Sequence, residues 1–336
     1  MDFGAMFRGK HNPPKDTNPS FAGRTIVVTG SNTGVGFEAS VKFVQLGAAR
    51  VILAVRSIKK GEDARMQIEQ RTGRKGVAEV WELDMLDYGS IKAFAARVDE
   101  EVERLDIAVL NAGIFMATFQ KSSYGWEKVL QVNVLSTSLL GLLLLPKLKA
   151  SKTADFTPVL ELVSSGNHFN VTTLATDPDS GAAGPLETYN HPATFNAITQ
   201  YNISKLFLEY GHAGLAALAT SPATGKPDVT VVSICPGATK SNLARDNTAW
   251  YMRAALFIFA LLFQRSTEEG ARTYISGAAL GEKGHGQFWQ DDRISEPAPL
   301  LSGEKGEKLQ AQVWHEIVVA LQKDVPEVDG LLKASG

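Results

Sequence analysis

The sequence predicts an α/β fold: one parallel, doubly wound sheet with helices on both faces. Three observations lead to this prediction. Short apolar runs rich in β-branched residues alternate with helical patterns along most of the chain. A glycine-rich turn directly follows the first of these runs, and no change in composition marks a second core. The 336 residues are 44% hydrophobic and 21% charged, which is enough to bury one large core.

The predicted strands are short and almost continuously apolar, as expected of strands that are buried on both faces. They cover 25–29, 51–55, 77–83, 107–110, 159–163 and 229–234, with a short last strand at 286–288. Helical patterns lie between them, at 37–46, after the capping residue Ser57, and at 90–104, 126–145, 200–219 and 267–280. We expect Pro146 to end the long apolar helix, because proline lacks the N–H that a helix interior needs.

We expect a single domain over residues 21–336. Residues 1–20 contain three prolines and no apolar core of signal-peptide length, so a flexible or loosely docked N-terminal tail is expected. The most apolar stretch, 254–263, is much shorter than the roughly 20 residues of a bilayer span, so no transmembrane segment is expected. A net charge of −2 gives no sign of a nucleic-acid partner. The single cysteine, Cys235, fits a reducing compartment such as the cytoplasm.

A glycine-rich turn at 29–36 joins the first strand to the first helix, which is the context of a Rossmann-type dinucleotide site. Gly30 permits a sharp turn, Gly34 allows backbone to approach a pyrophosphate, and Gly36 lets the helix pack against the strand. The amides of the helix N-terminus then face the phosphates. The alternative is a turn without a ligand. The expected cofactor contacts here are Gly30, Ser31, Asn32, Thr33, Gly34, Val35 and Gly36.

Arg56 follows the second strand, about 20 residues past the last glycine of the turn. At this position an acidic residue binds the ribose of NAD and an arginine binds the 2′-phosphate of NADP, so the sequence favours NADP(H). The alternative for Arg56 is a solvated surface residue. Asp84, next to Met85 at the end of the third strand, can accept from the adenine amino group or cap a turn. The small residues Asn111, Ala112 and Gly113 after the fourth strand let backbone pass close to a ligand.

Tyr201 and Lys205 lie four residues apart at the start of a predicted helix, so they share one face. A nearby ammonium favours the phenolate and is expected to lower the pKa of the tyrosine, which suits it to general acid/base catalysis. Lys205 can also bond the nicotinamide ribose. Ser165, which we favour over Ser164, ends the fifth strand at the sheet edge where ligands of such folds bind.

Asn133 interrupts an apolar helix, and a buried amide needs partners. It either holds a water that supplies protons to Lys205 or bonds helix backbone as a core residue.

These pieces together resemble the short-chain dehydrogenase/reductase family. The resemblance rests on Thr-Gly-x-x-x-Gly-x-Gly at 29–36, Asn-Ala-Gly at 111–113, Asn133, Ser165, Tyr201 with Lys205, and Pro236-Gly237. It implies a catalytic tetrad of Ser165, Tyr201, Lys205 and Asn133, and nicotinamide contacts from Pro236, Gly237 and Ser241, where the family usually has threonine. The segment 51–57 further resembles the NADP-preferring, retinol-dehydrogenase-like branch and its fungal relatives, which often reduce ketones in secondary metabolism.

Two segments depart from the usual family pattern or extend it. The stretch between Ser165 and Tyr201 is longer than in the family, so 166–200 is expected to form a substrate loop. Residues 242–266 are expected to form a lid, with an apolar part at 250–263. The alternatives for that part are an ordinary core helix and a membrane-surface or dimer contact.

The remaining candidates are interpreted as structural. His168 and His191 are expected to be loop residues without chemistry, and Cys235 to be core packing. No cysteine and histidine spacing suggests a metal site. Glu161 lies inside an apolar strand, where only an unseen partner or an exposed edge would explain it.

The sequence therefore predicts NADPH-dependent reduction of a ketone, or the reverse oxidation of an alcohol, on a bulky lipophilic substrate. A homo-oligomer is compatible with this prediction. The alternatives are an enzyme of the same fold with changed chemistry, such as a dehydratase, epimerase or pericyclase, and a non-catalytic NADP-binding regulator.

Overall fold

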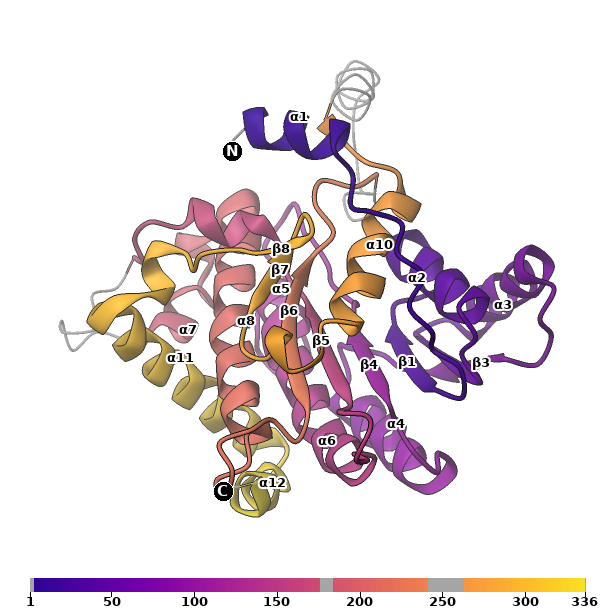
Figure 1. Ribbon diagram of the computed structural model, residues 1–336. Coiled ribbons are helices and arrows are strands. Elements are labelled where there is room, and N and C mark those ends of the chain that lie inside the picture. Colours follow the sequence, from indigo (N-terminus) through magenta and orange to yellow (C-terminus); the bar gives the residue numbers. More distant parts are fainter. Residues whose placement is uncertain (1–2, 176–183, 241–262, 336) are drawn as a thin grey trace.

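The computed structural model describes residues 3–175, 184–240 and 263–335 (Figure 1). Within these residues, eight strands form one sheet in the order β3-β2-β1-β4-β5-β6-β7-β8. All neighbours are parallel except β7 and β8, which pair antiparallel. The strands are β1 Thr25–Thr29, β2 Arg50–Val55, β3 Ala78–Glu82, β4 Ile107–Leu110, β5 Val159–Val163, β6 Thr230–Cys235, β7 Phe288–Gln290 and β8 Arg293–Ile294. The predicted α/β class, the Rossmann-type doubly wound sheet and the single domain are confirmed.

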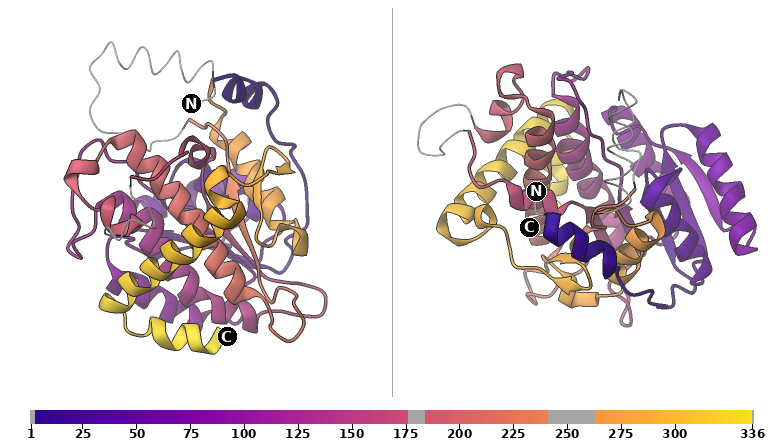
Figure 2. Two further views of the ribbon diagram at one scale, coloured as in Figure 1. Left: turned by 90° about the vertical axis from the view of Figure 1, so that its left-hand side faces the viewer. Right: turned by 90° about the horizontal axis from the view of Figure 1, so that it is seen from above.

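Two layers of helices cover the sheet, as Figures 1 and 2 show. One layer contains α2 (Gly34–Gln45), α3 (Ile58–Thr72) and α10 (Thr267–Ala278), which bury apolar side chains together with one face of the sheet. The other contains α4 (Tyr88–Glu101), α5 (Lys128–Leu130), α6 (Thr137–Ala150), α8 (Ala197–Ala219), α11 (Gly303–Asp324) and α12 (Val328–Ser335). The remaining pieces are α1 (Phe3–His11), α7 (Pro185–Thr188), a π-helical segment at Gln131–Ser136, and short 3₁₀ turns at Gly166–Asn170, Pro192–Thr194, Gly281–Gly284 and Pro299–Leu301.

The strand order reverses beside β1, because β2 lies on one side of it and β4 on the other. In open α/β sheets the crevice outside the carboxyl ends of the strands, at such a reversal, is where ligands bind. The central strands are held by burial: Ile26, Val27 and Val28 in β1 are fully buried. The loops at this edge therefore rest on a rigid base.

The long apolar helix differs from the prediction at its end. Pro146 does not stop it, and α6 continues to Ala150 with the proline inside. Pro146 lies on the exposed side of the helix, whereas Leu144, Leu145 and Leu148 are buried. The burial of these leucines outweighs the helical hydrogen bond that proline cannot donate. Residues 128–150 are long and apolar enough to cross a bilayer, which the sequence analysis overlooked; 89% of the apolar window is buried inside the molecule, so this stretch packs as a core helix.

The C-terminal region contains elements that were not predicted. We expected the last helix to end near residue 280, but α11 and α12 follow it. Leu309, Val313, Ile317 and Leu321 in α11 are buried at a spacing of four residues, which is the stripe of a helix packed on one face. This periodicity was visible in the sequence and could have identified the helix.

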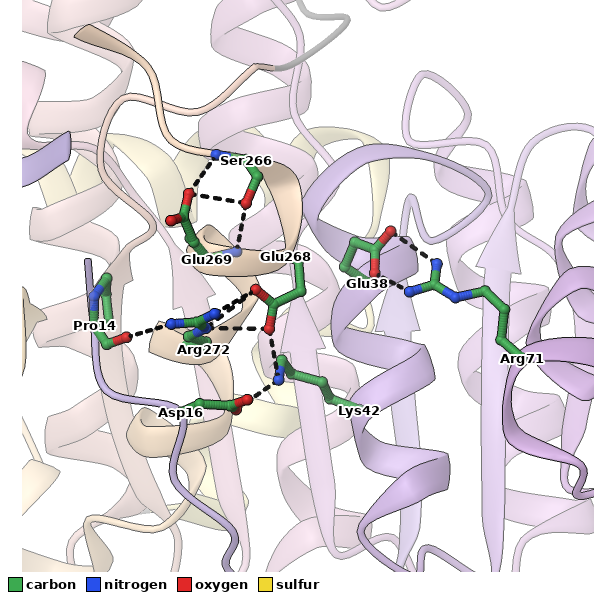
Figure 3. A network of polar contacts seen from close by, with 9 residues as sticks. All are labelled: Pro14, Asp16, Glu38, Lys42, Arg71, Ser266, Glu268, Glu269 and Arg272. Atoms are coloured by element: carbon green, nitrogen blue, oxygen red, sulfur yellow. Dashed lines mark hydrogen bonds and ion pairs between the residues drawn. The ribbon is translucent and has the colours of Figure 1, made fainter. Parts of the chain in front are cut away.

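The N-terminal segment is attached to the body of the protein, which agrees with the docked alternative and not with a flexible tail. Figure 3 shows how its residues bond to α2 and α10. Asp16 pairs with Lys42 at 2.6 Å, and Lys42 also pairs with Glu268 at 2.7 Å. Arg272 donates to the Pro14 carbonyl at 3.2 Å. Polar contacts with α2 and α10 thus hold Pro14 and Asp16, in a segment that composition alone predicted to be flexible or loosely docked.

Glu161 occupies the middle of β5, between β4 and β6, and is fully buried. Neither of its carboxylate oxygens has a hydrogen-bond partner among the described residues, so the expected partner or exposed edge is not found there. Its side chain is accommodated because Gly277 in α10 has none: a Cβ there would lie 2.5 Å from Glu161 Oε1. Burial raises the pKa of Glu161 well above its ordinary value.

Candidate active site

A cavity of about 1140 Å³ lies at the carboxyl edge of the sheet. It collects segments that are distant in sequence: the turn after β1, the ends of β2 to β5, the first turn of α8 and the loop after β6. Of the predicted site residues, those that line it are Gly30, Asn32, Thr33, Gly34, Val35, Arg56, Asp84, Met85, Asn111, Ala112, Gly113, Ser165, Tyr201, Lys205, Pro236 and Gly237. Ser31, Gly36 and Asn133 are not among the lining residues, and Ser241 lies outside the described residues.

The glycine-rich turn has the backbone that its sequence predicts. Gly30 and Gly34 have φ values of 65° and 69°, in the left-handed region that favours glycine. A side chain at Gly34 would meet nothing within 4 Å, so this position opens to the cavity. A Cβ at Gly36 would lie 2.4 Å from Asn111 Nδ2, so the absence of a side chain at Gly36 leaves room for the Asn111 carboxamide. Ser31 is fully buried and donates to the Val28 carbonyl at 2.8 Å, which makes it a support of the turn.

Asn111 joins three elements at the floor of the cavity. Its Nδ2 donates to the Thr29 carbonyl at 2.7 Å, and its Oδ1 accepts from the Tyr274 hydroxyl at 2.7 Å. The Ala112 amide donates to Thr29 Oγ1 at 2.8 Å. The segment after β4 is therefore held against the glycine-rich turn, with α10 as a second support.

The end of β2 carries positive charge. Arg56 and Lys60 line the cavity, and both side chains are exposed. Neither has an ion pair or hydrogen bond within the described part of the chain. Asp84 lines the cavity and also accepts from the Leu86 amide at 3.0 Å, so the turn cap named as its alternative role is observed, and its contact with adenine stays a prediction. Met85 is buried beside it, with its carbonyl accepting from Ser136 Oγ at 2.6 Å.

Tyr201 and Lys205 lie in the first turns of α8, which Asn196 caps by accepting from the amides of Ile198 and Thr199. Lys205 Nζ is 5.7 Å from the centre of the Tyr201 ring and donates to the Val163 carbonyl at 2.8 Å. The two side chains therefore share one face of the helix, as the sequence predicts.

Burial is the largest influence on the pKa values of both Tyr201 and Lys205. It lowers the pKa of Lys205 to about 8. It also raises the pKa of Tyr201 above its ordinary value, although the ring keeps some exposure toward the cavity, and the Ser165 hydroxyl acts in the opposite direction. The pKa of Tyr201 is therefore raised and not lowered as expected, because desolvation of the phenolate is the largest influence on it.

Ser165 is the serine whose side chain interacts with Tyr201. Its hydroxyl accepts from the Asn167 amide at 3.2 Å at the start of a 3₁₀ turn. His168 is buried in that turn, bonds the Ser165 carbonyl at 2.8 Å and stacks on Phe169. The Ser164 hydroxyl also lies in the wall of the cavity, but it is buried and has no partner among the described residues. The geometry thus favours Ser165 over Ser164.

Asn133 lies in the π-helical segment between α5 and α6. Its Oδ1 accepts from the Ile114 amide at 2.9 Å, and its Nδ2 donates to the Ile114 carbonyl at 3.0 Å and to Ser204 Oγ at 3.1 Å. π-Bulges are frequent at functional sites. Asn133 is therefore fixed behind Gly113, where a Cβ would lie 3.3 Å from its Oδ1 and 3.8 Å from Lys205 Nζ.

The structure describes two parts of the long segment between Ser165 and Tyr201, and residues 176–183 of the predicted loop lie outside the described residues. Gly166, Asn167, Phe169 and Asn170 line the cavity near its start, and Ile198 near its end. Residues 184–196 do not line it. There the Leu186 amide bonds Glu316 of α11 at 2.8 Å, and Asn190 accepts from the Glu127 amide at 2.7 Å. The expectation that the whole of 166–200 encloses the substrate was too broad, because its second part packs on other helices.

The predicted lid falls mainly on residues 242–262, which lie outside the described residues. The described end of the predicted lid borders the cavity through Phe263, Gln264 and Arg265.

Several lining residues were not predicted as site residues: Gly9, Lys10, Cys235, Thr239, Arg265, Tyr274, Gln290 and Asp291. Cys235 was assigned to core packing; it is buried, but its sulfur accepts from the amides of Gly166 and Gly237 in the cavity wall. The others come from the N-terminal segment and from the chain after β6. No local pattern marks them, since only the folded chain brings them to this edge. Within the described ranges there is no group of three metal-ligating side chains.

Comparison with known proteins agrees with these motifs. Residues 24–158 match the family model described as short chain dehydrogenase. The chain is 39% identical over 333 residues to the short-chain dehydrogenase/reductase ffsI of Aspergillus flavipes, covering 98% of this chain and 95% of that protein. It is 40% identical over 331 residues to the short-chain dehydrogenase/reductase phmF of Phaeosphaeria nodorum, with the same coverage of 98% and 95%.

Solved structures share the fold. A crystal structure of an uncharacterized protein from Mycobacterium paratuberculosis matches with a TM-score of 0.63 and 25% identity, over 90% of this chain and 95% of that chain. The RhlG/NADP active-site complex of Pseudomonas aeruginosa matches with a TM-score of 0.57 and 24% identity, over 80% of this chain and 94% of that chain. The identity to the fungal relatives over nearly their full length, together with this fold, shows that the chain belongs to the short-chain dehydrogenase/reductase family of oxidoreductases.

Proposed function

We propose that this protein is an NADP(H)-dependent ketoreductase. It reduces a ketone on a bulky lipophilic substrate, or oxidises the corresponding secondary alcohol. One observation carries the proposal: Tyr201, Lys205 and Ser165 line the same cavity as the glycine-rich turn and Arg56. A proton donor and a dinucleotide cradle therefore face one space.

The residues of the cavity fit a phosphorylated dinucleotide. The open position at Gly34 and the N-terminus of α2 provide a cradle for a pyrophosphate. Arg56 and Lys60, free of carboxylate partners within the described chain, suit a 2′-phosphate. The RhlG structure, which shares the fold, is described as an NADP complex. When bound, the nicotinamide supplies or accepts the hydride.

The protein's own groups handle the proton and the orientation of the substrate. Because its pKa is raised, the Tyr201 hydroxyl stays protonated at neutral pH and can donate to a carbonyl oxygen during reduction. Ser165, next to it, would hold the same oxygen. Lys205, with a pKa of about 8, is mostly charged at neutral pH and can donate to a ribose hydroxyl while it keeps its bond to Val163. Asn133 would hold Ile114 and Ser204 in place behind them.

The wall near Tyr201 supports a lipophilic substrate. Ile114, Phe115, Met116, Phe169 and Ile198 line the cavity there, and the Phe115 ring lies edge-on to Tyr201 at 6.0 Å. Apolar surface of this kind favours apolar ligands by about 25 cal/mol per Å² removed from water. A bulky ketone of fungal secondary metabolism, handled in the cytoplasm, fits this wall and the fungal origin of the relatives.

Cofactor titration and a substrate screen test the proposal. Purified protein should bind NADPH more tightly than NADH, and Arg56→Asp should remove that preference. Screening lipophilic ketones with NADPH should find turnover that small charged carbonyl compounds do not give. Tighter binding of NADH by the wild type, or a preference for small charged substrates, would contradict the proposal.

A further inference from the structure

The N-terminal helix α1 lies over the carboxyl edge of the sheet, at the top of the molecule in Figure 1 and in the foreground of the view from above in Figure 2. Its residues Gly9 and Lys10 line the same cavity as the glycine-rich turn. Their composition predicted a flexible or loosely docked tail. Their position raises the question of what they contact when the cavity is filled.

A buried arginine seats this helix. Arg265 is only 2% exposed and forms an ion pair with Asp291. Its Nε donates to the Gly9 carbonyl at 2.7 Å, and another nitrogen donates to the Pro236 carbonyl at 3.3 Å. A Cβ at Gly9 would lie 3.0 Å from the guanidinium, so glycine allows this close approach. The end of α1 is thereby joined to the loop after β6 that borders the cavity.

Further contacts hold the N-terminal segment after α1 against the rest of the protein. Residues 14–16 are held to α2 and α10 by the polar network of Figure 3, and the Lys15 amide donates to Asp292 at 2.8 Å. Lys10 is half-buried, and its Nζ donates to the Gln264 carbonyl at 2.8 Å. An ammonium has three donors, and only this one hydrogen bond of the Lys10 ammonium is found in the described structure.

The charge of the cavity wall indicates an anionic occupant. The described lining contains six cationic side chains, against the two carboxylates Asp84 and Asp291, in a chain whose net charge is −2. These cations are Lys10, Arg56, Lys60, Lys128, Lys205 and Arg265. Arg265 is paired with Asp291, Lys128 bonds the Gln120 side chain, and Lys205 bonds the Val163 carbonyl. Lys205 keeps further donors, but the proposed function assigns these to a ribose hydroxyl. The side chains of Arg56 and Lys60 have no partner in the described structure, and Lys10 keeps two of its three donors for a ligand.

These three cations lie at different ends of the cavity. Arg56 and Lys60 follow β2, on one side of β1 in the sheet order. Lys10 lies beside residues 264–265, which are joined to the loop after β6, on the opposite side of β1. A dinucleotide with its 2′-phosphate at Arg56 and its pyrophosphate at the glycine-rich turn would have its nicotinamide-side phosphate nearer the Lys10 end.

We propose that Lys10 is a cofactor-binding residue. Its ammonium, carried over the cavity by α1, binds the nicotinamide-side phosphate of the dinucleotide, and Arg265 acts as a positioning residue that holds the helix in place. This inference rests on the proposed use of NADP(H), and it adds the N-terminal segment to the cofactor site.

The test compares two lysines of the same segment in the full-length chain. Lys10→Met removes the charge at the cavity, and Lys15→Met removes a charge from an exposed side chain that does not line it. NADPH and 2′,5′-ADP are titrated against each protein; 2′,5′-ADP keeps the adenosine phosphates but lacks the nicotinamide half of the pyrophosphate. Lys10→Met should weaken NADPH binding roughly 10-fold, as expected for one charge-assisted contact, and leave 2′,5′-ADP binding nearly unchanged.

The controls separate the possible failures. Lys15→Met should bind both probes like the wild type, and Lys10→Arg should restore most of the NADPH affinity. The salt dependence of NADPH binding should be weaker in Lys10→Met. Equal NADPH affinity in the wild type and Lys10→Met would overturn the inference, as would an equal loss of both probes. Failure of the wild type to bind NADPH would instead overturn the proposed function.

Discussion

Tyr201 and Lys205 are one helical turn apart, and burial changes their proton affinities in opposite directions. The tyrosine is held in its neutral form, and the pKa of the lysine falls to about 8. Both shifts follow from the poor solvation of charge beneath the cavity wall. A neutral phenol next to the Ser165 hydroxyl is the protonation state that carbonyl reduction requires of its acid.

Replacing Tyr201 by phenylalanine tests this role. Tyr201→Phe keeps the ring against Phe115 but removes the proton, so kcat/KM should fall by roughly 10² to 10⁴-fold. Steady-state kinetics with a ketone found in the screen measure the loss, and NADPH titration checks that the cofactor site is intact. Near-normal turnover with unchanged NADPH binding would remove Tyr201 from the mechanism.

Glu161 gives a prediction about stability at the same scale. Its folded-state pKa is raised, so the unfolded chain releases this proton at a lower pH than the folded protein does. The stability linked to Glu161 is complete below its unfolded pKa and is lost as pH rises toward its folded pKa. Glu161→Gln should therefore be more stable than the wild type at neutral pH, with a difference that shrinks toward pH 4.

Urea unfolding of both proteins at several pH values measures this difference. The other titrating groups are common to the two chains, so the change in the gap with pH isolates Glu161. Because one pKa unit corresponds to about 1.4 kcal/mol, the gap at pH 7.5 measures how far folding raises the pKa of Glu161. A gap independent of pH, or a less stable variant, would show that Glu161 is solvated or paired in solution.

At the scale of elements, the junction of β1, α2 and β4 depends on a missing side chain. Gly36 leaves room for the Asn111 carboxamide, which is held by Thr29 and by Tyr274 from α10. A methyl group here would displace Asn111 and press on the Gly30 carbonyl, 3.2 Å from the added atom. The glycine therefore serves the packing of three elements, beyond any contact with a ligand.

Gly36→Ala should lower the free energy of unfolding by roughly 1–3 kcal/mol, as overpacking typically does, and should also weaken NADPH binding. Gly330→Ala is the matched control, because Gly330 is exposed in α12 and a Cβ there meets nothing within 4 Å. That change should be neutral or slightly stabilising, since alanine favours helices. Similar behaviour of the two variants in thermal and urea unfolding would contradict the packing argument.

At the scale of the whole molecule, one sheet carries both apolar cores, and the cavity lies across its edge. Residues from α1, the central strands, α8 and the chain after β6 all border this cavity. A ligand that fills it contacts both halves of the sheet. Binding should therefore stabilise the fold as a unit.

NADPH at about 100 times its Kd adds about 2.7 kcal/mol to the stability of a protein with one site. For a chain of this size we expect the unfolding midpoint to rise by a few degrees, roughly 3–6 °C. Circular dichroism and tryptophan fluorescence should report the same shift, because both cores belong to one sheet. A shift seen by one probe alone would indicate that the two halves unfold separately.

The sequence by itself determined the succession of strands and helices in the first half, the glycine-rich turn and the pairing of Tyr201 with Lys205. These are local properties: apolar runs define buried strands, glycine permits left-handed backbone, and a spacing of four residues places two side chains on one helix face. Family resemblance added Pro236 and Gly237, whose roles no local pattern states.

Only the tertiary structure decided the rest of the site and its electrostatics. Arg265, Tyr274 and Lys10 reach the cavity from segments far apart in the chain, so no periodicity could assign them. Continuation of α6 through Pro146 depends on packing that local propensity does not include. The pKa of Tyr201 likewise follows from how much water the folded chain excludes, a quantity that neighbouring residues in the sequence do not set.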